Sequence, residues 1–440
     1  MKVLFISLGC DKNLVDTEFM LGMLAESGYE FTDVEEEADI IIVNSCCFIR
    51  DAKEESIETI LEMAKWKEEG KCKALIVTGC LAQRYQNEIL TEIPEVDALL
   101  GTNSYDEIAA ALERTLKGDC VKVFHTLTSL PSQKTKRILS TPGHFAHLKI
   151  AEGCNKNCTY CIIPQIRGPY RSVPIEELVE QARTLVEGGV KELILVAQET
   201  TLYGMDLYGE KSLYKLLDQL NKLEGLVWIR ILYCYPEEID DTLIASILRN
   251  EKVCHYLDMP IQHSSDKILK SMGRRTTHNE LVEKIQTLRE KIPDICIRTT
   301  LISGFPGETE EEHQELLRFI QDMKFERLGV FNYSPEEDTP SIQFPNQVPE
   351  EQSELWRGEL MELSETMIAQ KNESLIGETY LVMIEGKVQE EHSYVARTYR
   401  DAPDIDGYLF ITTEEELMTG DFVRVNVTGA YEYDLIGEIV

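Results

Sequence analysis

The sequence has few basic residues for its length. Its 440 residues include 44 lysines and arginines against 78 aspartates and glutamates, so the formal net charge is −34. A charge of this sign repels polyanions and attracts basic partners, whereas proteins that bind nucleic acids usually present a basic surface. The composition therefore favours a basic partner over a nucleic acid. The alternative interpretation is that the negative charge only keeps the protein soluble.

Long apolar runs are missing as well. No run approaches the roughly 20 residues that a membrane-spanning helix needs. The N-terminus carries one short apolar stretch, Val3–Leu8, with no cleavage-site pattern behind it. We therefore expect a cytoplasmic protein with no membrane partner. Because a reducing compartment disfavours disulfides, the 12 cysteines are expected to be metal ligands or buried residues.

The chain is long enough for two or three domains. Residues 1–125 alternate apolar strands with helices, and this alternation predicts a doubly wound parallel α/β domain. A polar, turn-rich stretch at 126–143 is interpreted as a linker. The strands of the first domain are expected at Val3–Leu8, Asp39–Asn44, Ala74–Thr78 and Val96–Leu100.

A second alternating series occupies residues 144–370. Its six strands, with helices between them, predict a partial (β/α)6 barrel that is short of the eight units of a TIM barrel. One long connecting helix is expected from Glu350 to Asn372. Residues 373–440 then contain five short apolar runs separated by turns, which predict a small antiparallel β-barrel.

Three cysteines have the spacing C-x3-C-x2-C: Cys154, Cys158 and Cys161. Thiolates suit zinc or iron–sulfur clusters, but a structural zinc ion takes four ligands and no fourth Cys or His lies nearby in the sequence. On a cubane cluster, three thiolates leave one iron free for a substrate. The loop also follows the first strand of the predicted barrel, where barrel active sites lie. The spacing therefore favours a catalytic iron–sulfur cluster over zinc.

Three further cysteines each follow a strand of the N-terminal domain: Cys10, Cys46 and Cys80. We place all three in βα loops at the carboxyl edge of one parallel sheet, where ligands of open α/β sheets bind. This placement predicts a second cluster with three thiolate ligands. Cys47 could compete with its neighbour Cys46. Free cysteine is commonly buried, so a core position is expected for Cys72, Cys120, Cys234, Cys254 and Cys296.

The run LKIAEGCNKNCTYCIIP, from Leu148 to Pro164, resembles the radical S-adenosylmethionine (SAM) enzymes of the methylthiotransferase family, with Tyr160 as the aromatic before the last cysteine. The N-terminal cysteines resemble that family's second cluster domain, and the C-terminal barrel resembles its TRAM domain. The resemblance covers essentially the whole chain. It implies two [4Fe–4S] clusters, one on Cys10, Cys46 and Cys80 and a SAM-binding one on Cys154, Cys158 and Cys161.

The family has a branch that modifies a tRNA adenosine and a branch that modifies an aspartate of the small-subunit ribosomal protein S-twelve. The runs GCDKNLVD from Gly9, IRGPYRS from Ile166 and YCYP from Tyr233 resemble the ribosomal-protein branch. That branch usually has Pro at position 11 and Gly at position 47, but no ligand is lost here. Asn44-Ser45-Cys46 also matches the family better than a ligand at Cys47 would.

The resemblance implies that a one-electron reductant and SAM generate a 5′-deoxyadenosyl radical, which removes hydrogen from the β-carbon of the aspartate. A methylthio group is then installed there. Fifteen acids and four bases between Glu373 and Val440 agree with a ribosomal-protein substrate, free or in the assembling small subunit. A barrel that grips tRNA should be basic. A tRNA methylthiotransferase and a non-catalytic iron–sulfur scaffold remain the alternatives.

The resemblance assigns no catalytic side chain beyond the clusters, but it gives candidate SAM contacts. Besides Tyr160, these are Gly188 and Gly189 before the second barrel strand, and Gln198 at the end of that strand. A helix stop is an equal interpretation of the two glycines. Gly304 and Gly307 follow the fifth strand, where glycine would let the backbone approach adenine, and an ordinary turn is the alternative.

Overall fold

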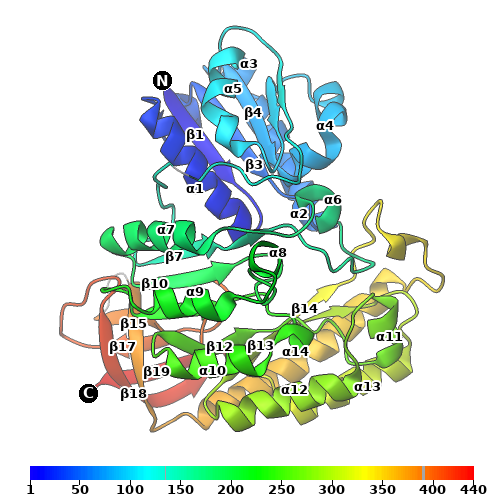
Figure 1. The fold of residues 1–440 in the computed structure, drawn as a ribbon, viewed down its shortest axis with the longest axis vertical. Coiled ribbons are helices and arrows are strands. Elements are labelled where there is room, and N and C mark those ends of the chain that lie inside the picture. The colour runs from blue at the N-terminus through cyan, green and yellow to red at the C-terminus, as the bar shows by residue number, and fades with distance from the viewer. Residues whose placement is uncertain (134, 389–391) are drawn as a thin grey trace. The chain divides into compact units, whose positions relative to one another are not determined.

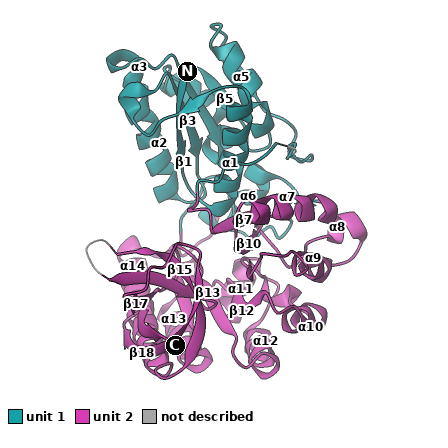
Figure 2. Cartoon of the chain, turned by 90° about the vertical axis from the view of Figure 1, so that its left-hand side faces the viewer, with its two compact units in different colours: residues 1–140, 151–173, 334–342 teal, residues 141–150, 174–333, 343–440 magenta. Residues whose placement is uncertain are grey.

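The computed structural model describes residues 1–133, 135–388 and 392–440. The chain forms two compact units (Figure 2). The first unit comprises residues 1–140, 151–173 and 334–342, and the second comprises residues 141–150, 174–333 and 343–440. In the described part of the chain, no helix is both long and apolar enough to cross a membrane.

The first unit is built on a six-stranded sheet in which all strands are parallel, in the order β2-β1-β3-β4-β5-β6. The predicted doubly wound domain is therefore confirmed. The edge strands β2 and β6 were not predicted, because two and three residues are too few to show a periodic pattern. The strands are β1 (Lys2–Ser7), β2 (Glu30–Phe31), β3 (Ile40–Ser45), β4 (Ala74–Gly79), β5 (Ala98–Leu100) and β6 (Val121–Val123).

Helices cover both faces of this sheet (Figure 1), because successive side chains of a buried parallel strand point to opposite faces. In β3, Ile40 and Ile42 pack with the helices of one face, whereas Ile41 and Val43 pack with those of the other. The first face carries α1 (Asp11–Glu26) and α5 (Ile108–Thr115), and the second carries α2 (Arg50–Ala64) and α4 (Cys80–Glu92). Three short helices complete the set: η1 (Glu35–Glu37), α3 (Trp66–Glu69) and η2 (Tyr105–Glu107).

Residues 151–173 follow a strand of the second unit in sequence but belong to the first unit. They contain a two-stranded antiparallel pair, β8 (Ala151–Glu152) with β9 (Arg171–Ser172), and the short helix α6 (Ile163–Arg167) between them. Ile162 and Ile166 are buried in the same apolar core as the side chains of α2 and α4. The C-x3-C-x2-C segment is thereby fixed to the N-terminal domain.

The second unit begins with a six-stranded parallel sheet whose strands follow one another in sequence order, with β7 and β14 at its edges. The predicted six βα units are confirmed. The strands are β7 (Phe145–Lys149), β10 (Glu192–Val196), β11 (Trp228–Ile231), β12 (Val253–Asp258), β13 (Cys296–Ser303) and β14 (Arg327–Asn332). The helices are α7 (Ile175–Glu187), α8 (Met205–Tyr208), α9 (Leu213–Leu220), η3 (Pro236–Glu238), α10 (Asp241–Arg249), α11 (Asp266–Ser271), α12 (His278–Lys291), α13 (Glu310–Met323) and η4 (Pro340–Gln343), of which η4 lies mostly in the first unit.

The long helix α14 (Glu350–Glu373) leads into a closed five-stranded barrel in the order β15-β16-β17-β19-β18. Alternate residues such as Val382, Ile384 and Val425 fill its core. Four of the five pairings are antiparallel, and the fifth, between β17 and β19, is parallel. The strands are β15 (Thr379–Lys387), β16 (Ser393–Thr398), β17 (Leu409–Thr412), β18 (Phe422–Tyr431) and β19 (Asp434–Ile439).

Candidate active site

The three N-terminal cysteines all lie at the carboxyl edge of the first sheet, as predicted. Cys10 is the N-cap of α1, and Cys46 follows β3 in a loop. Cys80 is the first residue of α4, directly after β4. The strands β1 and β3 are neighbours although β2 lies between them in sequence. Cys10 and Cys46 therefore flank the point where strand order reverses, which is the usual binding position in such sheets.

Glycines allow the three loops to approach one another closely. Gly9, before Cys10, has a φ of +88°, and a Cβ there would lie 2.7 Å from Cβ and 2.8 Å from Sγ of Cys46. Gly79, before Cys80, has a φ of +89°, and its added Cβ would lie 2.5 Å from the carbonyl oxygen of Ser45. Any side chain at either position would combine backbone strain with a steric clash. The two glycines thus permit the close approach of the cysteine loops.

Side-chain amides and a hydroxyl also fix these loops. The Asn13 amide donates to the carbonyl oxygen of Ser45 at 3.0 Å, and the Asn44 amide donates to the carbonyl oxygen of Asn13 at 2.9 Å. On the other side, the Ser56 hydroxyl accepts from the backbone N–H of Cys46 and donates to its carbonyl oxygen, both at 2.9 Å. The backbone around the cysteines is therefore held by hydrogen bonds within the protein.

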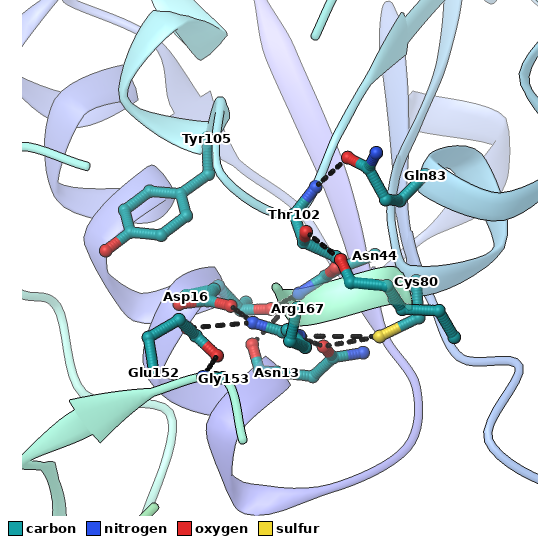
Figure 3. A network of polar contacts seen from close by, with 12 residues as sticks. Asn13, Asp16, Asn44, Cys80, Gln83, Thr102, Tyr105, Glu152, Gly153 and Arg167 are labelled. Atoms are coloured by element: carbon teal, nitrogen blue, oxygen red, sulfur yellow. Dashed lines mark hydrogen bonds and ion pairs between the residues drawn. The ribbon is translucent and has the colours of Figure 1, made fainter. Parts of the chain in front are cut away.

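A buried arginine joins this cysteine set to the segment that carries the other one (Figure 3). Nη1 of Arg167, at the end of α6, lies 2.8 Å from Oδ2 of Asp16 and 3.1 Å from Oε2 of Glu152. Nη2 donates to Oδ1 of Asn13 and lies 3.6 Å from Sγ of Cys80. Only 2% of the Arg167 side chain is exposed. One guanidinium therefore contacts α1, a candidate cluster ligand, and the strand that leads to Cys154.

Burial and this arginine act in opposite directions on the thiols. Burial raises the pKa of Cys80 well above its ordinary value, and the charge of Arg167 opposes that rise. The pKa of Cys46 is also raised, by burial and then by Cys10, with Arg167 again acting against it. Burial lowers the pKa of Arg167 itself, but Glu152, Cys80 and Asp16 raise it well above the ordinary value. Arg167 therefore stays charged and favours the thiolate, which is the form that binds metal.

The C-x3-C-x2-C segment is a tight turn between β8 and α6. The backbone N–H of Cys154 donates to the carbonyl oxygen of Gly168 at 3.1 Å, and that of Cys161 donates to the carbonyl oxygen of Cys158 at 3.0 Å. The backbone N–H of Lys156 donates to Sγ of Cys154 at 3.4 Å. Cys154 and Cys158 are buried, whereas Cys161 is partly exposed.

Both candidate donor sets consist of cysteine thiolates, which are ligands that suit iron–sulfur clusters. Within the described ranges, no three Cys, His, Asp or Glu side chains converge closely enough to hold one metal ion. On a cubane each thiolate binds a different iron, so the three sulfurs stand farther apart than the ligands of one ion. Two sets of three cysteines, each gathered on a few loops, have the ligand type and number that such clusters require.

The six remaining cysteines divide as follows. Cys47 is fully buried in the apolar core beside Cys46, and burial is the main cause that raises its pKa to about 12. Buried positions are confirmed for four others: Cys72, Cys234, Cys254 and Cys296. The prediction for Cys120 was wrong, because this residue is exposed in the connection between α5 and β6, just before β6 begins.

The candidate SAM contacts in the second unit lie at two different edges of its sheet. Gln198 comes just after β10 and Gly304 just after β13, so both stand at the carboxyl edge. Gly188 and Gly189 end α7 and precede β10, which places them at the opposite edge. The structure does not bring these two glycines together with Gln198, and a helix stop accounts for them.

The turn after β13 is held by its own chain. Gly304 has a φ of +77°, and a Cβ there would lie 2.5 Å from Cβ of Ser353 in α14. The backbone N–H groups of Gly304 and Phe305 donate to Oε2 of Glu308 at 2.7 and 3.1 Å. The close approach that Gly304 permits is therefore to α14. Gly307 has open space where a Cβ would be, and Tyr160 is partly exposed in the first unit.

No role was predicted from the sequence for Asn13, Asp16, Glu152 or Arg167, although the runs GCDKNLVD and IRGPYRS contain three of them. A signal was present. Asn13 and Asp16 are three residues apart, which puts them on one face of a helix, and both polar side chains follow a candidate ligand. What the sequence did not show is that α6 brings Arg167 to that face.

Three family models match consecutive parts of the chain. Residues 2–101 match the uncharacterized protein family UPF0004, residues 148–320 match the radical SAM superfamily, and residues 376–440 match the TRAM domain. The fold and these matches define an enzyme of the radical SAM superfamily.

Three relatives that match over the full length are named ribosomal protein uS12 methylthiotransferase RimO. The protein of Lachnoclostridium phytofermentans is 59% identical, with 99% of each chain covered. The proteins of Acetivibrio thermocellus and Clostridioides difficile are 50% and 47% identical and cover all of this chain, with 98% and 99% of their own lengths matched. The chain belongs to the RimO family.

Solved structures give the same fold at much lower identity. The radical SAM methyltransferase TsrM from Kitasatospora setae, solved with tryptophan substrate and a SAM analogue, has a TM-score of 0.55 and 12% identity over 88% of this chain and 79% of its own. The cobalamin-dependent SAM radical enzyme OxsB, with aqua-cobalamin and SAM bound, has a TM-score of 0.50 and 12% identity, covering 83% and 56%. These similarities concern the fold alone.

Proposed function

We propose that this enzyme installs a methylthio group on the β-carbon of an aspartate in ribosomal protein uS12. The observation that carries the proposal is identity of 47–59% over the full length to relatives of that name. Such an enzyme would work in the cytoplasm, on the free protein or on the assembling small subunit. The predicted domains, residues 1–125, 144–370 and 373–440, are part of this proposal.

Two [4Fe–4S] clusters would serve the reaction, one on Cys10, Cys46 and Cys80 and the other on Cys154, Cys158 and Cys161. Support comes from the first unit, which holds both cysteine sets and links them through Arg167. Reduced by an external one-electron donor, the second cluster supplies with SAM a radical that can remove hydrogen from an unactivated carbon. The protein's part is to hold the clusters, orient the aspartate and exclude water.

Four residues are proposed as SAM contacts on the family resemblance: Tyr160, Gln198, Gly304 and Gly307. Gly188 and Gly189 are not retained, because they lie at the amino edge of β10, and substrates of parallel barrels bind at the carboxyl edge. No side chain beyond the cluster ligands is assigned a catalytic role.

The surface of the C-terminal barrel supports a basic partner. Of its four basic residues, Arg397 and Arg400 are buried, which leaves Lys387 and Arg424 exposed. Among the described residues from Glu373 onward, eight acidic side chains are exposed: Glu373, Glu378, Asp404, Glu414, Glu415, Glu416, Glu432 and Glu438. Such a surface complements a lysine- and arginine-rich ribosomal protein and disfavours tRNA, whose phosphates need cations.

The direct test is to incubate the anaerobically reconstituted enzyme with SAM and a reductant, together with small ribosomal subunits or with total tRNA. Mass spectrometry then locates the methylthio group. We expect it on one aspartate of uS12, and its appearance on a tRNA adenosine would contradict the substrate. The matched control is Cys158→Ala, which should give neither product nor 5′-deoxyadenosine. An enzyme that never cleaves SAM would point to a non-catalytic scaffold.

A further inference from the structure

Arg167 divides its guanidinium between two kinds of partner. Nη1 faces the carboxylates of Asp16 and Glu152, at 2.8 and 3.1 Å. Nη2 faces Asn13 and the sulfur of Cys80, at 3.6 Å from the sulfur. Figure 3 shows these groups converging on the arginine from three segments of the chain. The carboxylates hold one side of the fork, so the other side is aimed at Cys80.

Burying these charged groups costs free energy. A guanidinium that is 2% exposed has lost its hydration, and its two carboxylates have lost theirs, so burial of such a group is weak evidence for stability. The network does have one electrostatic consequence. An N–H donor beside a cluster sulfur draws electron density from the cluster and makes an added electron more favourable.

We propose that Arg167 is a positioning residue that orients the Cys80 ligand and raises the reduction potential of the N-terminal cluster. The inference rests on the proposed function, because it needs a cluster on Cys10, Cys46 and Cys80. Asp16 has the opposite effect on the reduction potential. Its carboxylate offsets the charge of the arginine, so it holds the potential lower than Arg167 alone would set it. Because Arg167 is also bound to Glu152, the same group ties the strand before Cys154 to this cluster.

The test isolates the N-terminal cluster in the full chain. With Cys154, Cys158 and Cys161 all replaced by Ala, only that cluster can form, and its midpoint potential can be measured by an EPR-monitored redox titration. In this background, Arg167→Gln should lower the equilibrium ratio of reduced to oxidised cluster about tenfold at fixed potential, a shift of about 59 mV to more negative values for one electron. Asp16→Asn should shift the potential in the opposite direction.

Arg84 provides the matched control. Its guanidinium is also buried in the first unit, lies 2.8 Å from Oε2 of Glu336 and donates to the carbonyl oxygen of Cys47 at 3.4 Å. No hydrogen bond of Arg84 to a sulfur of the proposed ligand set is observed among the described residues. Arg84→Lys should therefore leave the potential unchanged, although it disturbs a comparable buried ion pair. A potential that moves equally in Arg84→Lys and Arg167→Gln would reduce Arg167 to a structural residue and overturn the inference.

Two further outcomes are distinguishable. A cluster that forms with the parent's potential in both Arg167→Gln and Asp16→Asn overturns the inference and leaves the proposed function intact. A background variant that binds no iron at all removes the N-terminal cluster from the proposed function, and the inference falls with it. If Arg167→Gln does not fold, Arg167→Lys replaces it in the test, because lysine keeps the charge but lacks the forked guanidinium. Arg167→Lys should then shift the midpoint potential to more negative values by a smaller amount, whereas Asp16→Asn should still shift it to more positive values.

Discussion

Arg397 and Glu192 form a fully buried ion pair, with 2.6 Å between Nη2 of Arg397 and Oε2 of Glu192. Glu192 begins β10 of the parallel sheet, and Arg397 belongs to β16 of the C-terminal barrel. A second guanidinium, that of Arg230 in β11, lies 2.7 Å from Oε1 of the same carboxylate. One buried acid therefore connects two strands of the sheet with the C-terminal barrel in the second unit.

Glu192→Gln should destabilise the protein strongly, because it removes the carboxylate that pairs with the buried guanidinium of Arg230 and leaves Arg397 its pair with Glu385. We expect a loss of about 3–5 kcal/mol in the free energy of unfolding, the range for breaking a buried pair, measured by urea denaturation. The control is Glu180→Gln, which breaks an exposed pair with Arg183 and should cost less than about 1 kcal/mol. Similar losses of unfolding free energy in both variants would show that the buried Glu192 carboxylate contributes no more to stability than an exposed one.

The same acid predicts a pH dependence. Burial acts to raise the pKa of Glu192, but Arg397 and Arg230 outweigh it and lower this pKa from 4.5 to about 2. The folded protein therefore favours the charged form of Glu192, and the stabilisation by this carboxylate is complete above about pH 4.5. It is lost as the pH falls from there through 2. The free energy of unfolding of the parent should decline more steeply over this range than that of Glu192→Gln, as acid titrations monitored by circular dichroism would show.

The sequence predicted the elements that carry a strong periodic pattern. The connecting helix expected from Glu350 to Asn372, for example, runs from Glu350 to Glu373. The elements that escaped prediction include β8, β9 and α6, which have two to five residues each, because no period can be read in so few residues. Their positions depend on Ile162 and Ile166, which pack on the core of the first unit, and this is a tertiary contact that local sequence does not encode.

The candidate site was predictable to the same extent. The three N-terminal cysteines could be placed close together, since strand ends in a parallel sheet share one edge. The Arg167 network could not, because its partners are separated by up to 154 residues in the chain. Gly188 and Gly189 were expected before the second barrel strand, and the structure places them at the end of α7, at the edge opposite Gln198.

Anaerobic reconstitution should load about eight irons per chain, four for each cluster. Replacing Cys10, Cys46 and Cys80 by Ala should reduce this to about four, measured by iron and sulfide analysis. Cys47→Ala is the control, because this buried neighbour packs in the apolar core and should leave the iron content unchanged. A parent that holds only about four irons, unaffected by the triple replacement, would exclude the N-terminal cluster.

The two cysteine sets should separate in function. Cys158→Ala should abolish the cleavage of SAM to 5′-deoxyadenosine, because the cluster proposed to bind SAM can no longer be held. Cys46→Ala should retain cleavage while failing to modify uS12, because only the other cluster is damaged. Chromatography of the nucleoside product and mass spectrometry of uS12 give the two readouts. Full product from Cys46→Ala would contradict the proposed role of the N-terminal set.

The acidic surface of the C-terminal barrel should control how the enzyme meets its substrate. Glu414, Glu415 and Glu416 are exposed in the loop between β17 and β18. Charge complementarity acts mainly on the encounter rate and is screened over a Debye length of about 10 Å at 0.1 M salt. Reversing all three to Lys should therefore raise the KM for uS12 several-fold, and added salt should have the same effect on the parent.

Glu62, Glu68 and Glu69 provide the control for that experiment. They are exposed on α2 and α3 of the first unit, and reversing them to Lys changes the net charge by the same amount. If long-range net charge alone attracts the ribosomal protein, both triple variants will raise the KM equally. If the C-terminal barrel is the docking surface, only the Glu414–Glu416 variant will do so, while SAM cleavage without substrate stays at the parent's rate in both. An unchanged KM in the Glu414–Glu416 variant would mean that these acids serve solubility and that uS12 docks elsewhere.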